Sequence, residues 1–252
     1  AYRRQRQMCI RDRLYSIGRV QTPTLALIVQ KEREIEKFVP QKFWEVIAIL
    51  ENGLKAKHQK ERLETLEEAK EIKKRSAGNA TVEKVEKSIR KRNPPHPLDT
   101  TTFLSIAASF GFSVDKAMRL AEDLYRYGYI SYPRTDNTVY PETLNLIQIA
   151  RRVCRGPYEK YLSLILSQEK IRPTRGPKRT TDHPPIHPVN YLPSGKFSKE
   201  HQIIYDIIVR HFLATIAPPS VWEHVKATLR IGSERYVLKG KRLLDPGWES
   251  IY

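Results

Sequence analysis

Two proline pairs divide this chain into segments of different character. Pro94-Pro95 and Pro218-Pro219 lack the amide hydrogens that a regular helix or central strand needs, and each pair disfavours a helical residue before it. Between the pairs, apolar residues recur with helical spacing, whereas outside them they alternate as in strands. We therefore predict a mixed α+β protein in which a helical unit, residues 94–216, is inserted into a β-rich unit formed by residues 41–93 and 217–252.

The β-rich unit is predicted from two hairpins and one further strand. Asn52-Gly53 is a favoured two-residue turn, and it separates the runs FWEVIAIL and LKAKH. Gly232-Ser233 separates VWEHVKATLRI from RYVLKG in the same way, and ATVEKVEKS is the remaining strand. The charged residues 61–75 are predicted to form an exposed helix. Its inward-facing residues are Leu63, Leu66, Ala69 and Ile72.

The helical unit is predicted to contain two short helices around a glycine turn. Thr100 can cap the first helix, and Ser113 can cap the second, which ends at Gly128. Such a pair resembles a helix-turn-helix arrangement. Two more helices are expected at about residues 141–154 and 198–212, with the basic, proline-rich loop EKIRPTRGPKRTTDHPPIHP between them.

The N-terminal 40 residues contain one further predicted helix. Residues 1–13 show neither helical nor strand spacing and no apolar run of the kind that a signal peptide has, so we leave them unassigned as a candidate non-native extension. Residues 14–40 include the segment GRVQTPTLALIVQ, in which Thr22 can cap a helix with Pro23 in its first turn. A loop that carries Arg19 and Gln21 therefore leads into the start of this helix.

The net charge limits the classes of partner. Lys and Arg number 45 against 28 acidic residues, a formal charge of +17, which favours a polyanion such as nucleic acid. A membrane surface is the rival polyanion, but no apolar run approaches the roughly 20 residues that a membrane span needs. The two cysteines, Cys9 and Cys154, form no CxxC motif, so we expect neither a disulfide framework nor a zinc site, and we expect a cytoplasmic protein.

The segment RYGYISYPRTDN combines a tyrosine and an arginine in a form suited to attack on a phosphodiester. Pro133 favours an extended backbone around it, and side chains two residues apart in an extended segment share a face. Tyr132 and Arg134 can therefore point at the same group. A neighbouring cation favours the phenolate form of a tyrosine, and a guanidinium can hold a phosphate by two hydrogen bonds.

Two other interpretations of these tyrosines remain open at this point. Tyr125, Tyr127, Tyr129 and Tyr132 can be ordinary packing residues that close a strand. Some of them can instead stack on unpaired bases, which contributes roughly 1–3 kcal/mol for each base stacked.

Three motifs in this order resemble the central region of type IA DNA topoisomerases. They are GRVQTPTLALIVQKEREI, PLDTTTFLSIAASFGFSVDKAMRLAEDLYRYGYI and SYPRTDN, and the resemblance covers Ser16 to Tyr252. SYPRTDN and DHPPIHP are closer to archaeal and topoisomerase III-like members than to the bacterial pattern TYMRTDS. The resemblance implies a gate architecture, in which a helical catalytic domain is carried on a β-rich hinge domain and residues 14–40 belong to a single-strand DNA-binding domain.

The resemblance also implies roles for individual residues. Tyr132 is the expected nucleophile that becomes joined to a 5′ phosphate of single-stranded DNA, with Arg134 as its phosphate-binding neighbour. His183 is expected to contact the backbone phosphate, although Pro184 and Pro185 depart from the family pattern and a solvated histidine is the alternative. Arg19 and Gln21 match residues that line the groove for the single strand.

Other candidate DNA contacts have a structural alternative. Thr100 is either a helix cap or a contact near the site, and Asp136 either orients Arg134 or caps the following turn. Arg172, Arg175, Lys178 and Arg179 form a basic run that is either a DNA-facing loop or a solvated one. A metal pair of His183 and His187 is disfavoured, because the HxxxH spacing aligns two ligands only on a helix and two prolines interrupt it.

The resemblance implies Mg²⁺ bound by acidic residues of a Toprim domain, and the sequence has no DxD-type acidic cluster. We therefore expect the chain to begin after that domain, to contain no metal site, and to bind single-stranded DNA weakly without relaxing supercoils by itself. The expected function is ATP-independent single-strand cleavage, strand passage and rejoining, by a nucleoid-associated enzyme that includes the remaining domains of its own full-length protein. The alternative is a non-enzymatic helix-turn-helix module that binds DNA.

Overall fold

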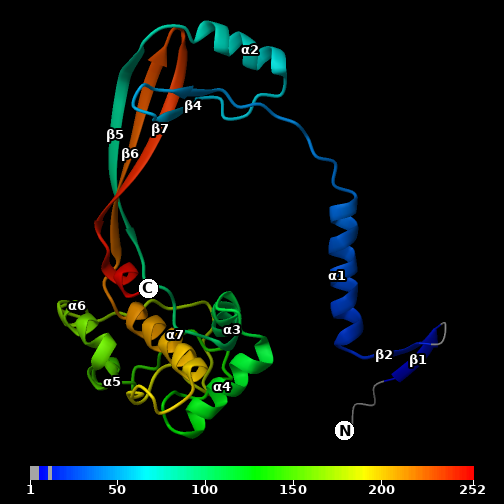
Figure 1. Ribbon diagram of the computed structural model, residues 1–252, viewed down its shortest axis with the longest axis vertical. Coiled ribbons are helices and arrows are strands. Elements are labelled where there is room, and N and C mark those ends of the chain that lie inside the picture. The colour runs from blue at the N-terminus through cyan, green and yellow to red at the C-terminus, as the bar shows by residue number, and fades with distance from the viewer. Residues whose placement is uncertain (1–5, 11–12) are drawn as a thin grey trace.

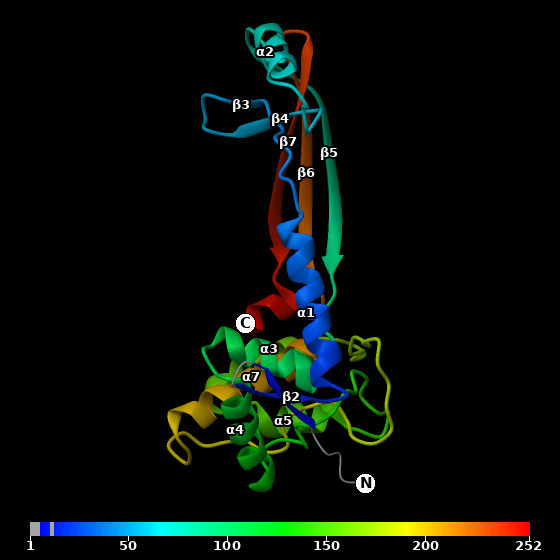
Figure 2. The same cartoon turned by 90° about the vertical axis from the view of Figure 1, so that its right-hand side faces the viewer.

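The structure is a computed structural model that describes residues 6–10 and 13–252. Figure 1 shows a helical unit at one end, a long sheet that rises from it, and a separate N-terminal arm that contains the helix α1. The view in Figure 2 shows α2 at the end of the sheet that lies far from the helical unit. The mixed α+β prediction is confirmed. None of the helices described is long and apolar enough to cross a membrane.

The sheet has five antiparallel strands in the order β3-β4-β7-β6-β5. Their bounds are Ile47–Ile49 for β3, Lys55–His58 for β4, Ala80–Arg92 for β5, Ser220–Ile231 for β6 and Glu234–Asp245 for β7. Both predicted hairpins are present. Since β5 pairs with β6 although the whole helical unit separates them in sequence, the predicted insertion is present too.

A small core lies at the far end of the sheet. Leu229, Ile231 and Tyr236 are buried there, and α2 (Leu66–Arg75) packs beside them through Ala69 and Ile72. Gly232 is required at the nearby turn, because its φ is +60° and an added Cβ would lie 2.1 Å from the carbonyl oxygen of Arg75. Every residue of β5 is exposed, and so are the last residues of β7, whereas most of β6 between them is half-buried.

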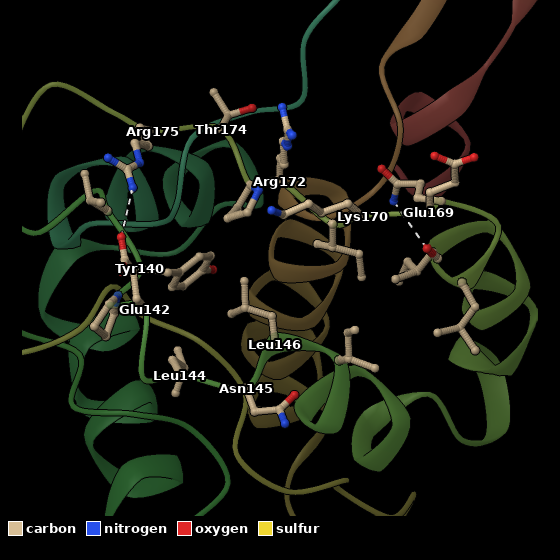
Figure 3. A pocket seen from close by; sticks show the side chains of 18 residues that line it. Tyr140, Glu142, Leu144, Asn145, Leu146, Glu169, Lys170, Arg172, Thr174 and Arg175 are labelled. Carbon is tan, nitrogen blue, oxygen red and sulfur yellow. Dashed lines mark hydrogen bonds and ion pairs between the residues drawn. The ribbon is translucent and has the colours of Figure 1, made fainter.

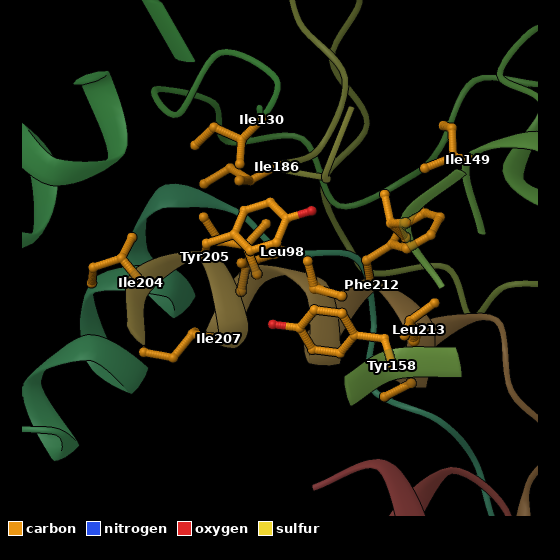
Figure 4. Close-up of a cluster of buried hydrophobic side chains, with 14 of the residues drawn as sticks. Leu98, Ile130, Ile149, Tyr158, Ile186, Ile204, Tyr205, Ile207, Phe212 and Leu213 are labelled. Atoms are coloured by element: carbon orange, nitrogen blue, oxygen red, sulfur yellow. The ribbon is translucent and has the colours of Figure 1, made fainter. Parts of the chain in front are cut away.

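The helical unit is built around α7, which contributes more buried residues to its core than any other helix described (Figure 4). The helices are α3 (Thr100–Ser109), α4 (Val114–Arg126), α5 (Leu146–Val153), α6 (Leu162–Leu166) and α7 (Lys199–Thr215), with the 3-10 helices η1 (Gly156–Tyr161) and η2 (Gly247–Ile251). Ile204, Tyr205, Ile208 and Phe212 of α7 are buried. Because α7 is apolar on most of its surface, the other helices and the loops can pack around it.

Several predicted helix ends are confirmed and others are wrong. Ser113 caps α4 by accepting a hydrogen bond from the Lys116 amide, and the pair α3 and α4 flanks Gly111 as predicted. The α5 helix begins five residues later than expected, because the Asn145 side chain caps it at that point. The predicted Thr22 cap is wrong: α1 (Gln21–Glu36) has Val20 at its N-cap and no side-chain cap. The α6 helix was not predicted.

The N-terminal arm differs from the prediction in one respect. The strands β1 (Arg6–Ile10) and β2 (Arg13–Ile17) pair as a hairpin, so the prediction that no strand lies in residues 1–13 is wrong for the residues described. Residues 1–5 and 11–12 lie outside the described residues. No residue of α1 is buried, and Figure 1 shows α1 apart from both the sheet and the helical unit.

His211 of α7 is buried, and its ring is hydrogen-bonded on both sides. Nε2 is 2.9 Å from the carbonyl oxygen of His96, and Nδ1 is 2.7 Å from the hydroxyl of Tyr252. Burial lowers the pKa of His211 to about 4, so the folded chain keeps this ring neutral. An unfolded histidine takes up a proton below about pH 6.5. Between these values the unfolded state binds more protons, so stability falls as the pH falls.

We predict that His211→Gln reduces the loss of thermal stability between pH 7.5 and pH 5, measured as the difference in melting temperature. The loss will not vanish, because burial also lowers the pKa of His187. His224→Gln, on β6, is the matched control and should leave the pH dependence as in the wild type. An equal loss in wild type and His211→Gln would contradict the prediction.

Candidate active site

The segment from Ser131 to Asp136 alternates between buried and exposed residues. Ser131 and Thr135 are buried, Tyr132 is half-buried, and Arg134 and Asp136 are exposed. This alternation is typical of an extended backbone, as Pro133 predicts. Tyr132 and Arg134 therefore face the same side of the segment.

Thr100 connects the start of α3 to this segment. Its hydroxyl accepts a hydrogen bond from the Thr135 amide at 2.8 Å and lies 2.8 Å from the carbonyl oxygen of Pro133, while its own amide donates to the carbonyl oxygen of Thr135 at 2.9 Å. Asp99 caps α3 instead, by accepting from the Thr102 amide at 2.8 Å. The predicted Thr100 cap is therefore wrong, because its hydroxyl holds the backbone on both sides of Arg134.

Two aromatic rings contact the ring of Tyr132. Tyr125 of α4 meets it edge to face at a centroid distance of 5.3 Å, and the ring of His183 lies at 4.6 Å, tilted by 50°. His183 is held there by its backbone, since its carbonyl oxygen accepts from the side-chain Nδ2 of Asn137 at 3.0 Å. Its imidazole is exposed, so it can reach a ligand that lies beside Tyr132.

His187 has a different environment. It is buried, and its Nδ1 lies 2.7 Å from the carbonyl oxygen of Pro185. Within the described part of the chain, no group of three or more His, Cys, Asp or Glu side chains could hold a metal ion.

Arg134 is paired with Glu122 of α4. Its Nε and Nη2 lie 2.9 Å and 2.6 Å from the same carboxylate oxygen, Oε1. Asp136 does not occupy this position. The turn that follows is capped by Asn137, whose side-chain oxygen accepts from the Val139 amide at 3.0 Å. Asp136 is exposed on the same side as Arg134.

The basic loop runs antiparallel to the segment that follows Asn137. The Thr138 amide donates to the carbonyl oxygen of Lys178, and the Gly176 amide donates to that of Thr138. Gly176 permits this close approach, because an added Cβ would lie 2.4 Å from the Thr138 hydroxyl. The four basic residues of the loop are exposed: Arg172, Arg175, Lys178 and Arg179. They precede His183 in the sequence and extend the exposed basic surface along the loop.

A cavity of about 810 Å³ lies at the far end of this loop (Figure 3). Apolar residues of α5 and α6 form part of its wall, and Lys170, Arg172 and Arg175 are on its loop side. Arg175 also lies 3.7 Å from Glu142. Tyr140 belongs to the wall, and burial raises the pKa of its hydroxyl, so it is a packing tyrosine and is poorly suited to act as a nucleophile.

Arg19 and Gln21 are not brought to Tyr132. Both are exposed and lie at the start of α1, which stands apart from the helical unit in Figure 1. The structure thus places Tyr132, Arg134, His183 and Thr100 together, and it places Arg19 and Gln21, the candidate groove residues, on a separate arm. Glu122 is the site residue that the sequence did not reveal. Helical spacing places Glu122 on the same face of α4 as Tyr125. Only the structure shows that this face meets the site.

Comparisons with known proteins identify the family of this chain. A family model described as DNA topoisomerase matches residues 3–252. The chain is 45% identical over 237 residues to DNA topoisomerase 1 of Archaeoglobus fulgidus, a match that covers 94% of this chain and 35% of the relative. DNA topoisomerase 3 of Caenorhabditis elegans is 30% identical over 261 residues, or 96% of this chain and 32% of the relative. The chain thus spans about a third of the length of these relatives.

The solved structures lead to the same family. Full-length topoisomerase I from Thermotoga maritima matches with a TM-score of 0.70 and 28% identity, over 95% of this chain and 41% of that one. The chain therefore belongs to the type IA DNA topoisomerase family, as its motifs indicated. The predicted likeness to archaeal and topoisomerase III proteins is confirmed by the relatives named above.

We predict that Thr100→Val destabilises the helical unit by about 1–3 kcal/mol, because it leaves the Thr135 amide without its partner. Chemical denaturation measures this loss. Thr101→Val is the matched control: Thr101 is the next residue on α3 and is exposed, so its loss should be small. Equal losses for the two variants would mean that the hydroxyl of Thr100 does not hold the segment.

Proposed function

We propose that this chain supplies the nucleophile and the phosphate-binding groups for transient cleavage of single-stranded DNA. The observation that carries the proposal is the placement of Tyr132 and Arg134 on one side of an extended segment, with His183 against the tyrosine ring. Membership of the DNA topoisomerase family supports it. Cleavage, passage of a strand and rejoining would together change DNA topology.

The proposed reaction exchanges one phosphate ester for another. The Tyr132 hydroxyl attacks the phosphorus, the bond to the 3′ oxygen breaks, and the 5′ end of the cut strand becomes linked to the tyrosine. Tyr132 loses its proton, and the departing 3′ oxygen gains one. The reverse attack by the 3′ hydroxyl reseals the strand. Because the ester bond is conserved in both steps, rejoining needs no ATP.

Arg134 and His183 would act on the phosphate itself. A guanidinium can donate two parallel hydrogen bonds to a phosphate, and it stabilises negative charge that develops on the oxygens during attack. His183 lies against the Tyr132 ring and is exposed, so it can donate a further hydrogen bond. Thr100 would act through the backbone, since it holds the segment on both sides of Arg134.

The remaining candidate residues would contact the DNA strand away from the cut. Arg172, Arg175, Lys178 and Arg179 continue from His183 along an exposed loop, where cations can neutralise successive phosphates. Asp136 lies on the same side as Arg134. Arg19 and Gln21 are proposed to bind the strand from the N-terminal arm, which requires that the arm and the helical unit approach each other when DNA is bound.

The proposed domains follow from the fold. Residues 94–216 would form the catalytic domain, residues 41–93 and 217–252 the hinge domain that carries it, and residues 14–40 part of a single-strand DNA-binding domain. The solvated strands next to the helical unit support the hinge, because β5 and the last residues of β7 are exposed there. The origin of residues 1–13 stays a prediction.

The expected Mg²⁺ would be bound outside the residues described here. The described residues do not offer a suitable set of carboxylates, and no step above depends on a metal. Binding of Mg²⁺ by a Toprim domain, cooperation with further domains of the same protein, and association with the nucleoid remain proposals. A DNA-binding module without catalysis is not favoured, because the family and the relatives are topoisomerases.

Covalent capture of DNA tests the proposal. The full-length protein is incubated with labelled single-stranded DNA and Mg²⁺ and is then separated on a denaturing gel. We predict a labelled protein band that Tyr132→Phe abolishes, while the affinity for DNA changes little, because only the attacking oxygen is lost.

Tyr125→Phe is the matched control, since Tyr125 contacts the same ring and is 43% exposed. It should retain the band. If Tyr132→Phe still captured DNA, or if the unaltered protein bound DNA without capture, Tyr132 would be a packing or stacking residue.

A further inference from the structure

Glu122 occupies one of the edges of the Arg134 guanidinium that can bind a phosphate. Both Nε and Nη2 of Arg134 contact Oε1 of Glu122, at 2.9 Å and 2.6 Å. These are the same two hydrogens that a guanidinium presents when it binds an oxyanion along one edge. A phosphate cannot take this edge of Arg134 until the carboxylate leaves it.

The pair is placed beside the nucleophile by α4. Glu122 lies three residues before Tyr125, so both side chains project from one face of the helix, and the Tyr125 ring packs against Tyr132. One helix face therefore contacts both the proposed nucleophile and its neighbouring arginine.

Glu122 is committed to Arg134 and to no other cation in the described chain. The adjacent carboxylate, Asp123, faces His201 at 3.5 Å and Arg126 at 3.9 Å instead. Glu122 is 27% exposed and Arg134 is 59% exposed, so solvent and salt reach the pair, and an exchange of partners does not require the core to open. A buried pair would be far harder to separate.

We infer that Glu122 is a built-in competitor of the DNA phosphate for Arg134. Without DNA, the carboxylate holds the guanidinium in order beside Tyr132. When a strand binds, the phosphate takes these donors only after the ion pair with Glu122 has been broken, and the loss of that pair offsets part of the binding free energy. Glu122 thus lowers the affinity of the site for the DNA backbone. This inference rests on the proposed function.

The test compares DNA affinities in the full-length protein. All variants carry Tyr132→Phe, so that binding is measured without cleavage, and fluorescence anisotropy follows a labelled single-stranded oligonucleotide at low salt. Glu122→Gln keeps the shape of the side chain and removes its charge. We expect it to lower the Kd about two- to fivefold, the size of effect typical of an exposed ion pair. The gain should shrink as salt increases.

Two controls isolate the interaction. Asp123→Asn removes the same charge one residue further along α4, away from Arg134, and should change the Kd much less. In an Arg134→Ala background, Glu122→Gln should have no effect on the Kd, because no guanidinium is left for which Glu122 and the phosphate compete. Melting temperatures confirm that each variant is folded.

Three results would overturn the inference: unchanged or weaker binding by Glu122→Gln, an equal gain from Asp123→Asn, or a gain that persists without Arg134. The comparison also separates this inference from the proposed function. If Arg134→Ala weakens binding while Glu122→Gln does nothing, only the role of Glu122 fails. If Arg134→Ala leaves the affinity unchanged, the phosphate-binding role of Arg134 fails and the inference fails with it.

Discussion

The antiparallel ladder between β5 and β6 is the interaction on which the rest of the molecule depends. It runs from the pair Ala80 and Ile231 to the pair Arg92 and Ser220, and so it holds the two ends of the helical insertion side by side. With its ends joined, the insertion folds around α7 as a unit with its own core. Arg210 of α7 then donates to the carbonyl oxygen of Ile251, which connects that core to the C-terminal turn after β7.

Hydrogen bonds to irregular backbone position the candidate site. The segments on either side of Tyr132 and His183 belong to no long helix or strand, and side chains supply the partners that a regular ladder would supply. Thr100 bonds the backbone around Arg134, Asn137 bonds the carbonyl oxygen of His183, and Thr138 bonds that of Lys178. Loops held in this way can be specific in shape and still expose their reactive groups.

The sequence predicted the elements whose signals are local. The turns at Asn52-Gly53 and Gly232-Ser233, the Ser113 cap and the insertion between the proline pairs were all readable from short patterns. What it could not predict depends on distance in space. Thr100 has the sequence position of a helix cap. In the folded chain, however, residue 135 lies close to it, and its hydroxyl binds the backbone of that residue instead of capping the helix.

The same limit applied to the candidate site. Tyr132 and Arg134 were predicted together because they are two residues apart on an extended segment. Glu122 is 12 residues before Arg134, on a helix whose orientation no local pattern determines. Arg19 matched a family motif, but a motif does not specify how far Arg19 lies from Tyr132 in space. That distance depends on the whole chain between them, including the sheet.

The exposed stretch of the sheet has a mechanical consequence. A strand of 12 residues such as β6 spans roughly 40 Å at about 3.3 Å per residue, and it connects the small core at the far end of the sheet to the helical unit. A lever of that length converts a bend of about 10° at its base into a displacement of roughly 7 Å at its tip. Small changes in strand twist next to the helical unit thus displace the far end of the sheet, with α2, by several ångströms relative to the helical unit while β5 and β6 stay paired.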